Sequence, residues 1–443
     1  MVDSYLGKMT FHQLIDAGQL EIGDGYRAQN NELGGSGPIF LRSGHVTESH
    51  IDFVGVERFQ IHLTEKVRSK MSQLGDTIVT TKGNSTGRTA FVTERLPSFV
   101  YSPHLSYWRS RNPQKLCNGF LRYWSQGNEF IRQLTGMKAS TDMAPYLSLT
   151  DQRRLTITLP PIAEQNAIAK ILGVLDEKIE TNRLMNATLE AMTRAFFQSW
   201  FIDFDPVRAK SEGRMPVGMD AATARLIPSG FADSSIGKLP KGWRAGTLAD
   251  CASISKATID PGDHPDEEFQ HFSLPSFDAG QYPTIEKGRE IKSNKFSIPT
   301  SALLLSKLNP RIPRVWIPDL SGATQPVCST EFIVLQPKLA DGGKEHLYGI
   351  ITSSDFLQSM ASRVTGTSGS HQRVRPDDCM AIGCVIPDQL VIRHFSDIAK
   401  PMMQRMASNR REMQFLKITR DTLLPKLLSG EVSVAKFEGA SNV

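Results

Sequence analysis

Two short polar segments hold the side chains of this sequence that are best suited to binding chemistry. TTKGNSTGR (80–88) and SKLNPRIPR (306–314) each place Lys, Asn, Arg and hydroxyl groups on a turn that follows an apolar burst. Lys and Arg can hold phosphates or guanine edges, and Asn can pair with adenine through two hydrogen bonds. Each residue taken singly more often belongs to an ordinary solvated hairpin tip, but the repetition at matching positions favours contact with nucleic acid for the segments.

Further donors stand in a second polar loop of each half, TGMKASTDM (135–143) and TGTSGSHQR (365–373). Arg109 follows two aromatic residues that could either stack on bases or fill a core. The candidate DNA-binding residues are Lys82, Asn84, Ser85, Thr86, Arg88, Arg109, Lys138, Ser140, Thr141, Ser306, Lys307, Asn309, Arg311, Arg314, Thr367, Ser368, His371, Gln372 and Arg373.

The sequence offers little for catalysis. It has no GxxxxGKS/T phosphate loop, no HExxH or GxSxG motif and no Cys/His cluster with metal-ligand spacing. One nuclease-like pattern, Asp266 with Glu290 and Lys292, could hold Mg²⁺ and activate water, but so short a pattern often arises by chance. We therefore expect a non-catalytic chain that binds no metal or cofactor, with a self-sufficient Mg-dependent nuclease and a protein-binding adaptor as the alternatives.

The composition of the chain indicates how many domains it can form and in which cellular compartment it is expected. The chain has 443 residues, 40% of them hydrophobic and 22% charged, which is enough for two or three domains. Its net charge of +5 permits a polyanionic partner without requiring one. Five scattered cysteines without a CxxC pair favour a reducing compartment, and the sequence shows neither a membrane span nor a secretory signal, so we expect a cytoplasmic protein.

The sequence also repeats itself. A shift of 227 residues superposes Asp151 on Asp378 and continues without a gap over the following helix-like stretch. A nearly equal shift of 225 places Lys82 on Lys307. Because order and spacing are kept along each half, the chain is predicted to contain two copies of one module.

Each module consists of a strand-rich part and a long helix. Short β-branched runs between turn residues predict mixed α/β structure in the first part. Apolar residues at alternating steps of four and three predict helices over 162–202 and 389–428, in which Asn182 and Asn409 occupy the same seam position. We expect the two helices to pair as an antiparallel coiled coil, with these asparagines fixing the register, rather than to lie singly on a core.

The second helix contains Pro401, which predicts either a kink or a helix that begins there. The seam of the first helix, from 168 to 200, would span about 48 Å at about 1.5 Å per residue, or about 14 base pairs of duplex. Two modules at the ends of such a pair would read two separated and different half-sites.

Three stretches carry a family resemblance. The segment 159–210, which begins LPPIAEQNAIAKILGVLDEKIETNRL, closely resembles the central conserved region of type I restriction-modification specificity subunits. IGKLPKGW (236–243) and TLLPKLLSGEV (422–432) are similar to that family's entry to its second recognition domain and its distal helix end. The chain departs from the family pattern where IPDQLVIRHF (386–395) replaces an LPP-x-x-EQ run.

The resemblance implies an α+β fold with two similar mixed α/β target-recognition domains, separated by an antiparallel pair of long coiled-coil helices in a pseudo-twofold repeat. The expected divisions are a first recognition domain, the central helix, a linker, a second recognition domain, the distal helix and a tail, at 1–158, 159–205, 206–238, 239–387, 388–432 and 433–443.

The resemblance further implies a non-catalytic subunit that reads a bipartite asymmetric DNA target. Its partners would be double-stranded DNA, two DNA adenine methyltransferase subunits and two ATP-dependent restriction/translocase subunits, on which S-adenosylmethionine, ATP and Mg²⁺ are expected; a fused methyltransferase-nuclease is the related alternative. The residues that the resemblance marks for methyltransferase docking or positioning are Leu159, Pro160, Pro161, Glu164, Gln165, Trp200 and Phe201.

Overall fold

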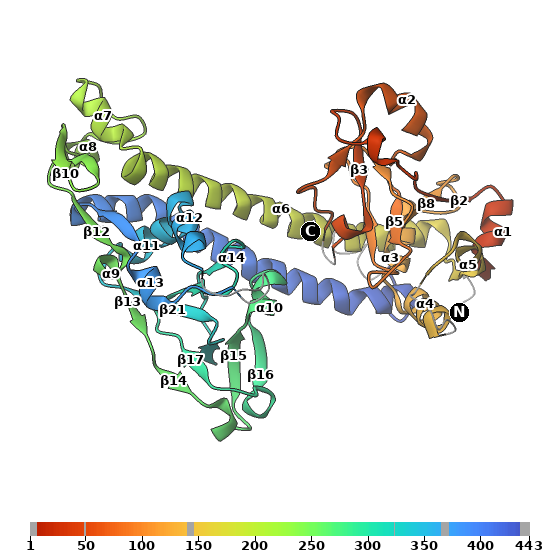
Figure 1. The fold of residues 1–443 in the computed structure, drawn as a ribbon. Helices are drawn as coiled ribbons and strands as arrows, with labels where there is room; N and C mark the ends of the chain where they lie inside the picture. Colours follow the sequence, from red (N-terminus) through yellow and green to blue (C-terminus); the bar gives the residue numbers. More distant parts are fainter. Residues whose placement is uncertain (1–6, 48–49, 140–145, 323, 365–371, 435–443) are drawn as a thin grey trace, which may run out of the picture. The chain divides into compact units, whose positions relative to one another are not determined.

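The computed structural model describes residues 7–434 except 48–49, 140–145, 323 and 365–371. The chain divides into two compact units, 1–179 with 415–443 and 180–414, and the division falls inside two long helices. Within the described part of the chain, no helix is long and apolar enough to cross a membrane. Figure 1 shows the elements of each unit.

The first unit is built on a twisted antiparallel sheet with the strand order β2-β8-β5-β6. A second sheet, β4-β3-β7, contains one parallel pair, β3 with β7. A short ladder of β1 with β9 joins the beginning and the end of the recognition domain. The strands are β1 (Lys8–Thr10), β2 (Leu20–Asp24), β3 (Ile39–Leu41), β4 (Glu57–Arg58), β5 (Thr77–Thr80), β6 (Thr89–Phe91), β7 (Phe99–Tyr101), β8 (Leu105–Ser110) and β9 (Thr156–Thr158).

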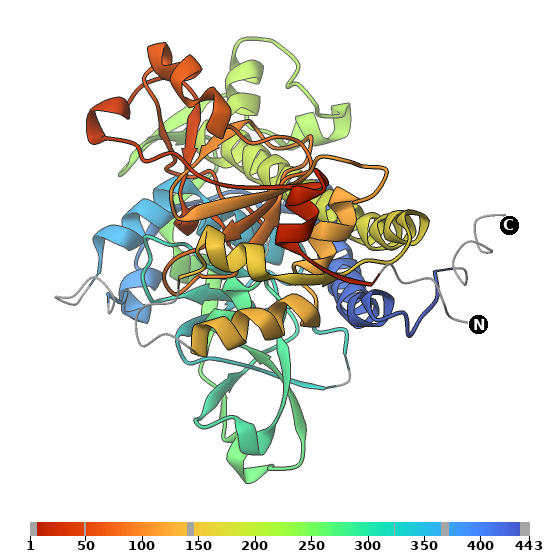
Figure 2. The same cartoon turned by 90° about the vertical axis from the view of Figure 1, so that its right-hand side faces the viewer.

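Helices lie against this sheet, as the ribbon in Figure 2 shows, and a cluster of buried aromatic residues supports it. Phe11 lies edge-on against Trp108, with ring centroids 5.0 Å apart, and Phe130 packs on the other side of the same indole at 5.4 Å. This cluster extends to Leu172 and Leu427 of the long helices. The helices of the recognition domain are α1 (Phe11–Asp16), α2 (Thr64–Val67), α3 (Asn118–Trp124), α4 (Asn128–Ala139) and α5 (Leu149–Arg154).

The second unit has the corresponding sheet, in the strand order β13-β21-β18-β19, and a five-stranded sheet, β14-β17-β20-β15-β16, in which β15 runs parallel to β20. Its closing ladder pairs β12 with β22. The strands are β12 (Arg244–Thr247), β13 (Ala252–Ser255), β14 (Thr258–Ile259), β15 (Glu268–Phe272), β16 (Thr284–Lys287), β17 (Lys295–Ser297), β18 (Leu303–Ser306), β19 (Val315–Trp316), β20 (Gln325–Cys328), β21 (Phe332–Pro337) and β22 (Gly383–Ile386). The helices are α9 (Leu248–Cys251), α10 (Leu274–Asp278), α11 (Gly343–Thr352), α12 (Ser354–Ser362) and α13 (Pro376–Met380).

The two units share one topology, which confirms the predicted repeat. Along the chain, the first strand of each parallel pair, β3 or β15, comes between the first and second strands of the main sheet, and its partner, β7 or β20, comes between the third and fourth. Both units also close with a ladder whose first strand leads into a capped short helix. Thr10 caps α1 and Thr247 caps α9. In each case the backbone amide of the threonine also donates a hydrogen bond to the side chain of the third helical residue. Such a capping box fixes where a helix begins. The same local sequence signals therefore start the same elements in each copy.

The long helices are α6 (Ile162–Phe197), extended by a π-helical turn (Gln198–Ile202), and α14 (Gln389–Leu428). These bounds confirm the predicted helices. The alternative of a helix that begins at Pro401 is wrong, because α14 starts twelve residues earlier. Ala399 and Met403, on either side of the exposed proline, are both buried in the core of the second unit, and this packing holds the helix together across the missing hydrogen bond.

The two helices pair antiparallel. In the second unit Asn182 Nδ2 donates to Glu412 Oε2 at 2.9 Å, and Asn409 Nδ2 donates to Asn186 Oδ1 at 2.8 Å. In the first unit Arg420 Nη1 lies 2.8 Å from Asp176 Oδ1. Residue numbers rise along α6 as they fall along α14, which establishes the direction. Asn182 and Asn409 are fully buried, but each bonds to a different residue of the opposite helix rather than to the other.

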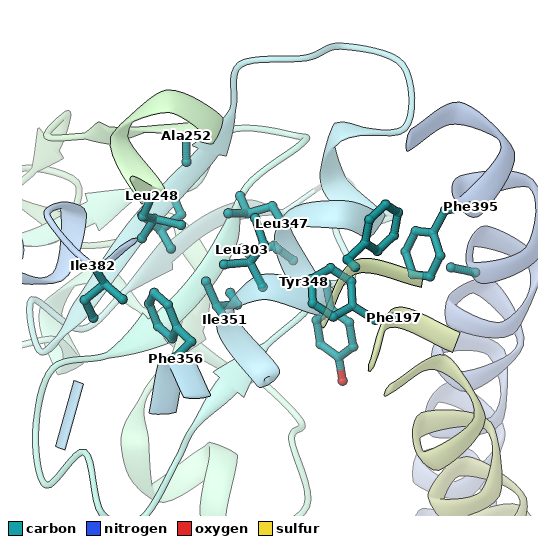
Figure 3. Packing of buried hydrophobic residues seen from close by; sticks show 14 of the residues in the cluster. Phe197, Leu248, Ala252, Leu303, Leu347, Tyr348, Ile351, Phe356, Ile382 and Phe395 are labelled. Atoms are coloured by element: carbon teal, nitrogen blue, oxygen red, sulfur yellow. The ribbon is translucent and has the colours of Figure 1, made fainter. Parts of the chain in front are cut away.

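The segment 206–238 is folded onto the second unit. It contains α7 (Asp205–Ser211), α8 (Ala221–Leu226) and a hairpin of β10 (Phe231–Ser234) and β11 (Gly237–Pro240). Val207 and Ile227 are buried in the core cluster that α6 and α14 share with the second recognition domain. Figure 3 shows part of this core, where Phe197 of α6 and Phe395 of α14 face Tyr348 and Leu347 of α11. A stretch without helical periodicity can thus still contribute buried residues.

Candidate nucleic-acid interface

The first polar segment forms a tight turn between β5 and β6. Gly83 and Gly87 adopt φ angles of +83° and +87°, which L side chains rarely reach, and Thr86 Oγ1 donates to the Gly83 carbonyl at 2.7 Å. A Cβ on Gly87 would stand 2.0 Å from Leu134, so the turn packs closely on α4. The turn is therefore a defined surface feature rather than a loose loop.

This turn presents two of the predicted side chains to solvent. Lys82 and Asn84 are exposed, Ser85 is half-buried, and Thr86 is buried. Arg88 is half-buried, and its Nη1 donates to the Val46 carbonyl at 2.9 Å. An exposed cation and an exposed amide on a rigid turn suit phosphate and base contacts.

The second unit has the corresponding turn between β18 and β19. Lys307 is half-buried, Asn309 adopts a left-handed φ of +47°, and Arg311 is exposed. Arg314 is held by Asp278 through two hydrogen bonds of 2.7 and 2.9 Å. Ser306 is buried and caps the turn through the Leu308 backbone. This turn thus offers a different set of groups from the first.

In each unit a backbone bridge joins this turn to a residue at or just beyond the end of the second polar segment. In the first unit an isolated bridge pairs Lys82 with Tyr146, and the Leu147 amide donates to Thr81 at 2.9 Å. In the second unit the matching bridge pairs Leu308 with Arg373.

The second-unit bridge has its own set of bonds. The Asn309 amide donates to the Gln372 carbonyl at 2.9 Å, and the Arg373 guanidinium pairs with Glu331 at 3.0 Å, which raises the pKa of Arg373. The bridge partner is thus Arg373, the last residue of the second polar segment, in the second unit, and Tyr146, three residues beyond that segment, in the first.

Several candidates lie outside the described residues, namely Ser140, Thr141, Thr367, Ser368 and His371. The backbone of Lys138 belongs to α4, and its side chain is likewise outside the description. For these positions DNA contact stays a prediction.

Arg109 is placed inside the first unit instead of on its surface. Only 6% of the residue is exposed, and its guanidinium donates to both carboxylate oxygens of Asp76, at 2.6 and 2.7 Å. The ring of Tyr107 lies beneath it at 4.5 Å, and burial raises the pKa of Tyr107 to about 12. The Tyr101 hydroxyl completes the network at 2.7 Å from Asp76. The Arg109 guanidinium thus links β8 to Asp76, the residue that directly precedes β5.

The nuclease-like residues do not come together as a metal site. Asp266 pairs with Arg289, and Glu290 accepts the Lys287 amide at 2.9 Å to cap its own turn. Among the described residues, no group of three His, Cys, Asp or Glu side chains could hold a metal ion. The geometry therefore gives no support to a self-sufficient nuclease.

Most residues marked for docking are buried. Gln165 is fully buried, accepts the Cys117 amide at 2.9 Å and donates to Pro160 at 2.9 Å, which fixes the start of α6 against α3. Leu159, Pro160, Trp200 and Phe201 are buried as well, while Pro161 and Glu164 are half-buried. In the structure these side chains pack at the two ends of α6 and its π-helical extension and hold those ends in position.

Two shallow grooves were missed at the sequence level. In the first unit a groove of about 260 Å³ lies where α4 begins beside the end of α14, and it is lined by Gln126, Gly127, Asn128, Asp421, Leu424 and Pro425. In the second unit a groove of about 370 Å³ lies where α12 begins beside the end of α6, and it is lined by Arg194, Ala195, Phe197, Gln198, Gly349, Thr352, Ser353, Ser354 and Leu357.

The grooves are equivalent under the internal repeat. The shift of 227 that aligns the two halves places Arg194 on Asp421, Phe197 on Leu424 and Ser354 on Gly127. The internal repeat of the sequence therefore relates the two grooves. Using the repeat to predict them would have required knowing that each α/β domain packs on the carboxyl end of a long helix.

Comparison with known proteins agrees with this geometry. Residues 28–191 match the model of the type I restriction modification DNA specificity domain. The chain is 24% identical to the type I restriction enzyme HindI specificity subunit of Haemophilus influenzae, over 89% of this chain and 94% of that one. It is also 24% identical to the MjaIX specificity subunit of Methanocaldococcus jannaschii, over 70% of this chain and 67% of that one. The chain is therefore similar to type I restriction-modification specificity subunits.

The fold of this chain also has a solved counterpart. The crystal structure of the type I restriction-modification S subunit from M. genitalium matches over 95% of each chain, with a TM-score of 0.56 and 15% sequence identity. The likeness confirms the predicted fold class. Which side chains of this chain contact DNA, and which surfaces contact partners, stay predictions.

Proposed function

We propose that this chain is the DNA-recognition subunit of a type I restriction-modification complex, in which each recognition domain reads one half of a bipartite target. The observation that carries the proposal is the repeated surface made by the turn after β5 or β18 and its bridged neighbour. Each copy gathers cationic, amide and hydroxyl groups on a rigid support. Methylation and cleavage belong to partner subunits, which carry S-adenosylmethionine, ATP and Mg²⁺.

The two half-sites are expected to differ. In the first unit the turn offers exposed Lys82 and Asn84, whereas in the second it offers exposed Arg311 and a half-buried Lys307. Different donors at equivalent positions recognise different base edges. A specificity subunit with two unlike heads therefore selects an asymmetric target.

The paired helices are proposed to set the spacer between the half-sites. Buried asparagines in an antiparallel seam disfavour slippage, because a shifted register would break the hydrogen bonds that their Nδ2 groups donate to Glu412 and Asn186. Insertion of seven residues into both α6 and α14 adds about 10 Å of helix, or about three base pairs. The tolerated spacer should lengthen accordingly, and an unchanged spacer would refute this role.

The equivalent grooves are proposed as the docking sites for two copies of the methyltransferase subunit. Repeated sites on one chain suit identical partners. The grooves carry unlike charges, Asp421 in one and Arg194 in the other, so recognition would use what they share. That common element is the exposed first residue of a short helix, Asn128 of α4 or Ser354 of α12, above a buried apolar side chain, Leu424 or Phe197.

Two experiments test the function directly. Footprinting of the chain together with its methyltransferase subunits should show two protected blocks on DNA, with an affinity that falls steeply as salt rises. Absent or salt-insensitive binding would favour a protein adaptor instead. Incubation of the purified chain with plasmid and Mg²⁺ should leave the plasmid intact, and cleavage without partners would favour the nuclease alternative.

A further inference from the structure

Two cysteines of the second unit meet where its recognition domain closes. Cys251 is the last residue of α9, and Cys384 lies on β22, opposite Gly246 of β12. Their sulfur atoms are 4.0 Å apart, although 133 positions separate the residues in the chain. A disulfide bond requires about 2 Å between the sulfur atoms, so side-chain rotations that move each sulfur by about 1 Å would allow the bond to form.

In the first unit, the positions equivalent to these two cysteines hold aliphatic residues that serve packing alone. The equivalent ladder pairs Met9 with Ile157, and in the repeat Ile157 corresponds to Cys384, while Leu14 of α1 corresponds to Cys251. Leu14 and Ile157 are fully buried, whereas both cysteines are half-buried. The second unit thus replaces two core aliphatic residues by a pair of thiols that solvent can reach.

The surroundings favour reaction at one sulfur. A hydrogen bond from Cys384 lowers the pKa of the Cys251 thiol, and Arg244 and Lys338 act in the same direction. Burial raises the pKa of Cys328 and of Cys379 to about 12, so these two thiols are poor nucleophiles.

We propose that Cys251 and Cys384 form a reversible dithiol–disulfide site that reacts with hydroperoxides and staples the second recognition domain shut. The Cys251 thiolate attacks the peroxide oxygen and becomes a sulfenic acid, with release of the first water or alcohol. The Cys384 sulfur then attacks the sulfenic sulfur, forming the S–S bond with release of water. The two thiols lose two electrons and two protons, and the peroxide takes up both.

The staple would tie α9, the helix that follows the first strand of the domain, to β22, the last strand before α14. A cross-link over a loop of this length removes much conformational freedom from the unfolded chain. We expect oxidation to raise the Tm of the second unit by about 5 °C or more. The inference does not depend on DNA recognition, because it concerns only how the second domain closes.

The test is to treat the purified full chain with hydrogen peroxide, block free thiols with N-ethylmaleimide and map the tryptic peptides without reduction. The expected product joins peptide 245–256 to peptide 374–393, is about 2 Da lighter than their sum, and is separated by dithiothreitol. Fragment ions must place the link at Cys384 rather than at Cys379 of the same peptide. Maleimide on both Cys251 and Cys384 after oxidation, or separate sulfinic acids, would overturn the proposal.

Variants supply the matched comparison. Cys384→Ser should abolish both the joined peptide and the rise in Tm, while Cys117→Ser, which removes a half-buried thiol of the first unit, should keep both. A Tm rise that persists in Cys384→Ser would show that another group causes it and would overturn the staple. If Cys384→Ser fails to fold, the peptide map of the unmodified chain still decides.

Discussion

The buried pair of Arg109 and Asp76 allows a test that separates structural support from DNA contact. Asp76 is fully buried and accepts four hydrogen bonds, two from Arg109 and one each from the Tyr101 hydroxyl and the Gln73 amide. Replacing Arg109 by Met leaves a carboxylate inside the protein without its counter-charge. Loss of one partner from such a pair costs about 3–5 kcal/mol.

The control is Arg111→Met. Arg111 also pairs with a carboxylate, Glu21, but its side chain is 53% exposed. An exposed ion pair contributes at most about 1 kcal/mol. A second comparison replaces Asp76 and Arg109 together by apolar residues, which removes both buried charges and should be less destabilising than Arg109→Met alone.

Hydrogen exchange of the β5 and β8 amides is the suitable assay, because it reports on the first unit by itself in a chain of two units. We expect Arg109→Met to lower the protection of these strands by about 3–5 kcal/mol and Arg111→Met to change it little. If Arg109→Met kept full protection yet abolished DNA binding, Arg109 would be a contact residue and the interface described above would be wrong.

Three further predictions concern the surfaces and the core. Lys82→Ala and Lys307→Ala should each weaken DNA binding by the holo-complex mainly at one half-site and reduce the slope of log affinity against log salt by about 1, measured by gel shift at several salt concentrations; unchanged slopes in both would exclude these lysines. Asn128→Arg and Ser354→Arg, both in the grooves and exposed, should each lower the methyltransferase content of the purified complex from two copies to one, whereas Gln358→Arg, exposed on α12 outside the groove, should leave two; native mass spectrometry measures this. Burial lowers the pKa of His346 to about 3, so the unfolded chain takes up a proton near pH 6.5 that the folded chain does not, and stability should fall by about 1.4 kcal/mol per pH unit below that value. Urea unfolding at pH 7 and pH 5 should show a loss of about 2 kcal/mol that His346→Leu removes, and an equal loss in that variant would contradict the assignment.

Periodic patterns in the sequence predicted the long-range architecture well. The heptad spacing predicted both long helices, because one continuous apolar stripe requires one continuous helix. The internal repeat predicted the shared topology, since conserved spacing of short strands and turns leaves few other ways to fold. Pro401 shows the limit of a local rule, because tertiary packing on both sides of it outweighs the lost hydrogen bond.

The candidate site was predicted only in part, for a physical reason. The sequence indicated which segments carry polar groups, and the structure bridges the turn of each unit to a residue at or just beyond the end of the second such segment. Whether a charged side chain faces solvent or a buried counter-charge depends on residues distant in sequence. Arg109 finds Asp76 thirty-three positions away, and Arg314 finds Asp278 thirty-six positions away. No local pattern contains those pairings.

The most direct test of the central claim is to map N6-methylated adenines across the genome of a host that carries the cognate methyltransferase, with and without this chain. Two unlike reading heads predict one motif in two short, different parts around a spacer of fixed length, methylated only when the chain is present. Identical methylation in both strains, or a single uninterrupted motif, would contradict the account.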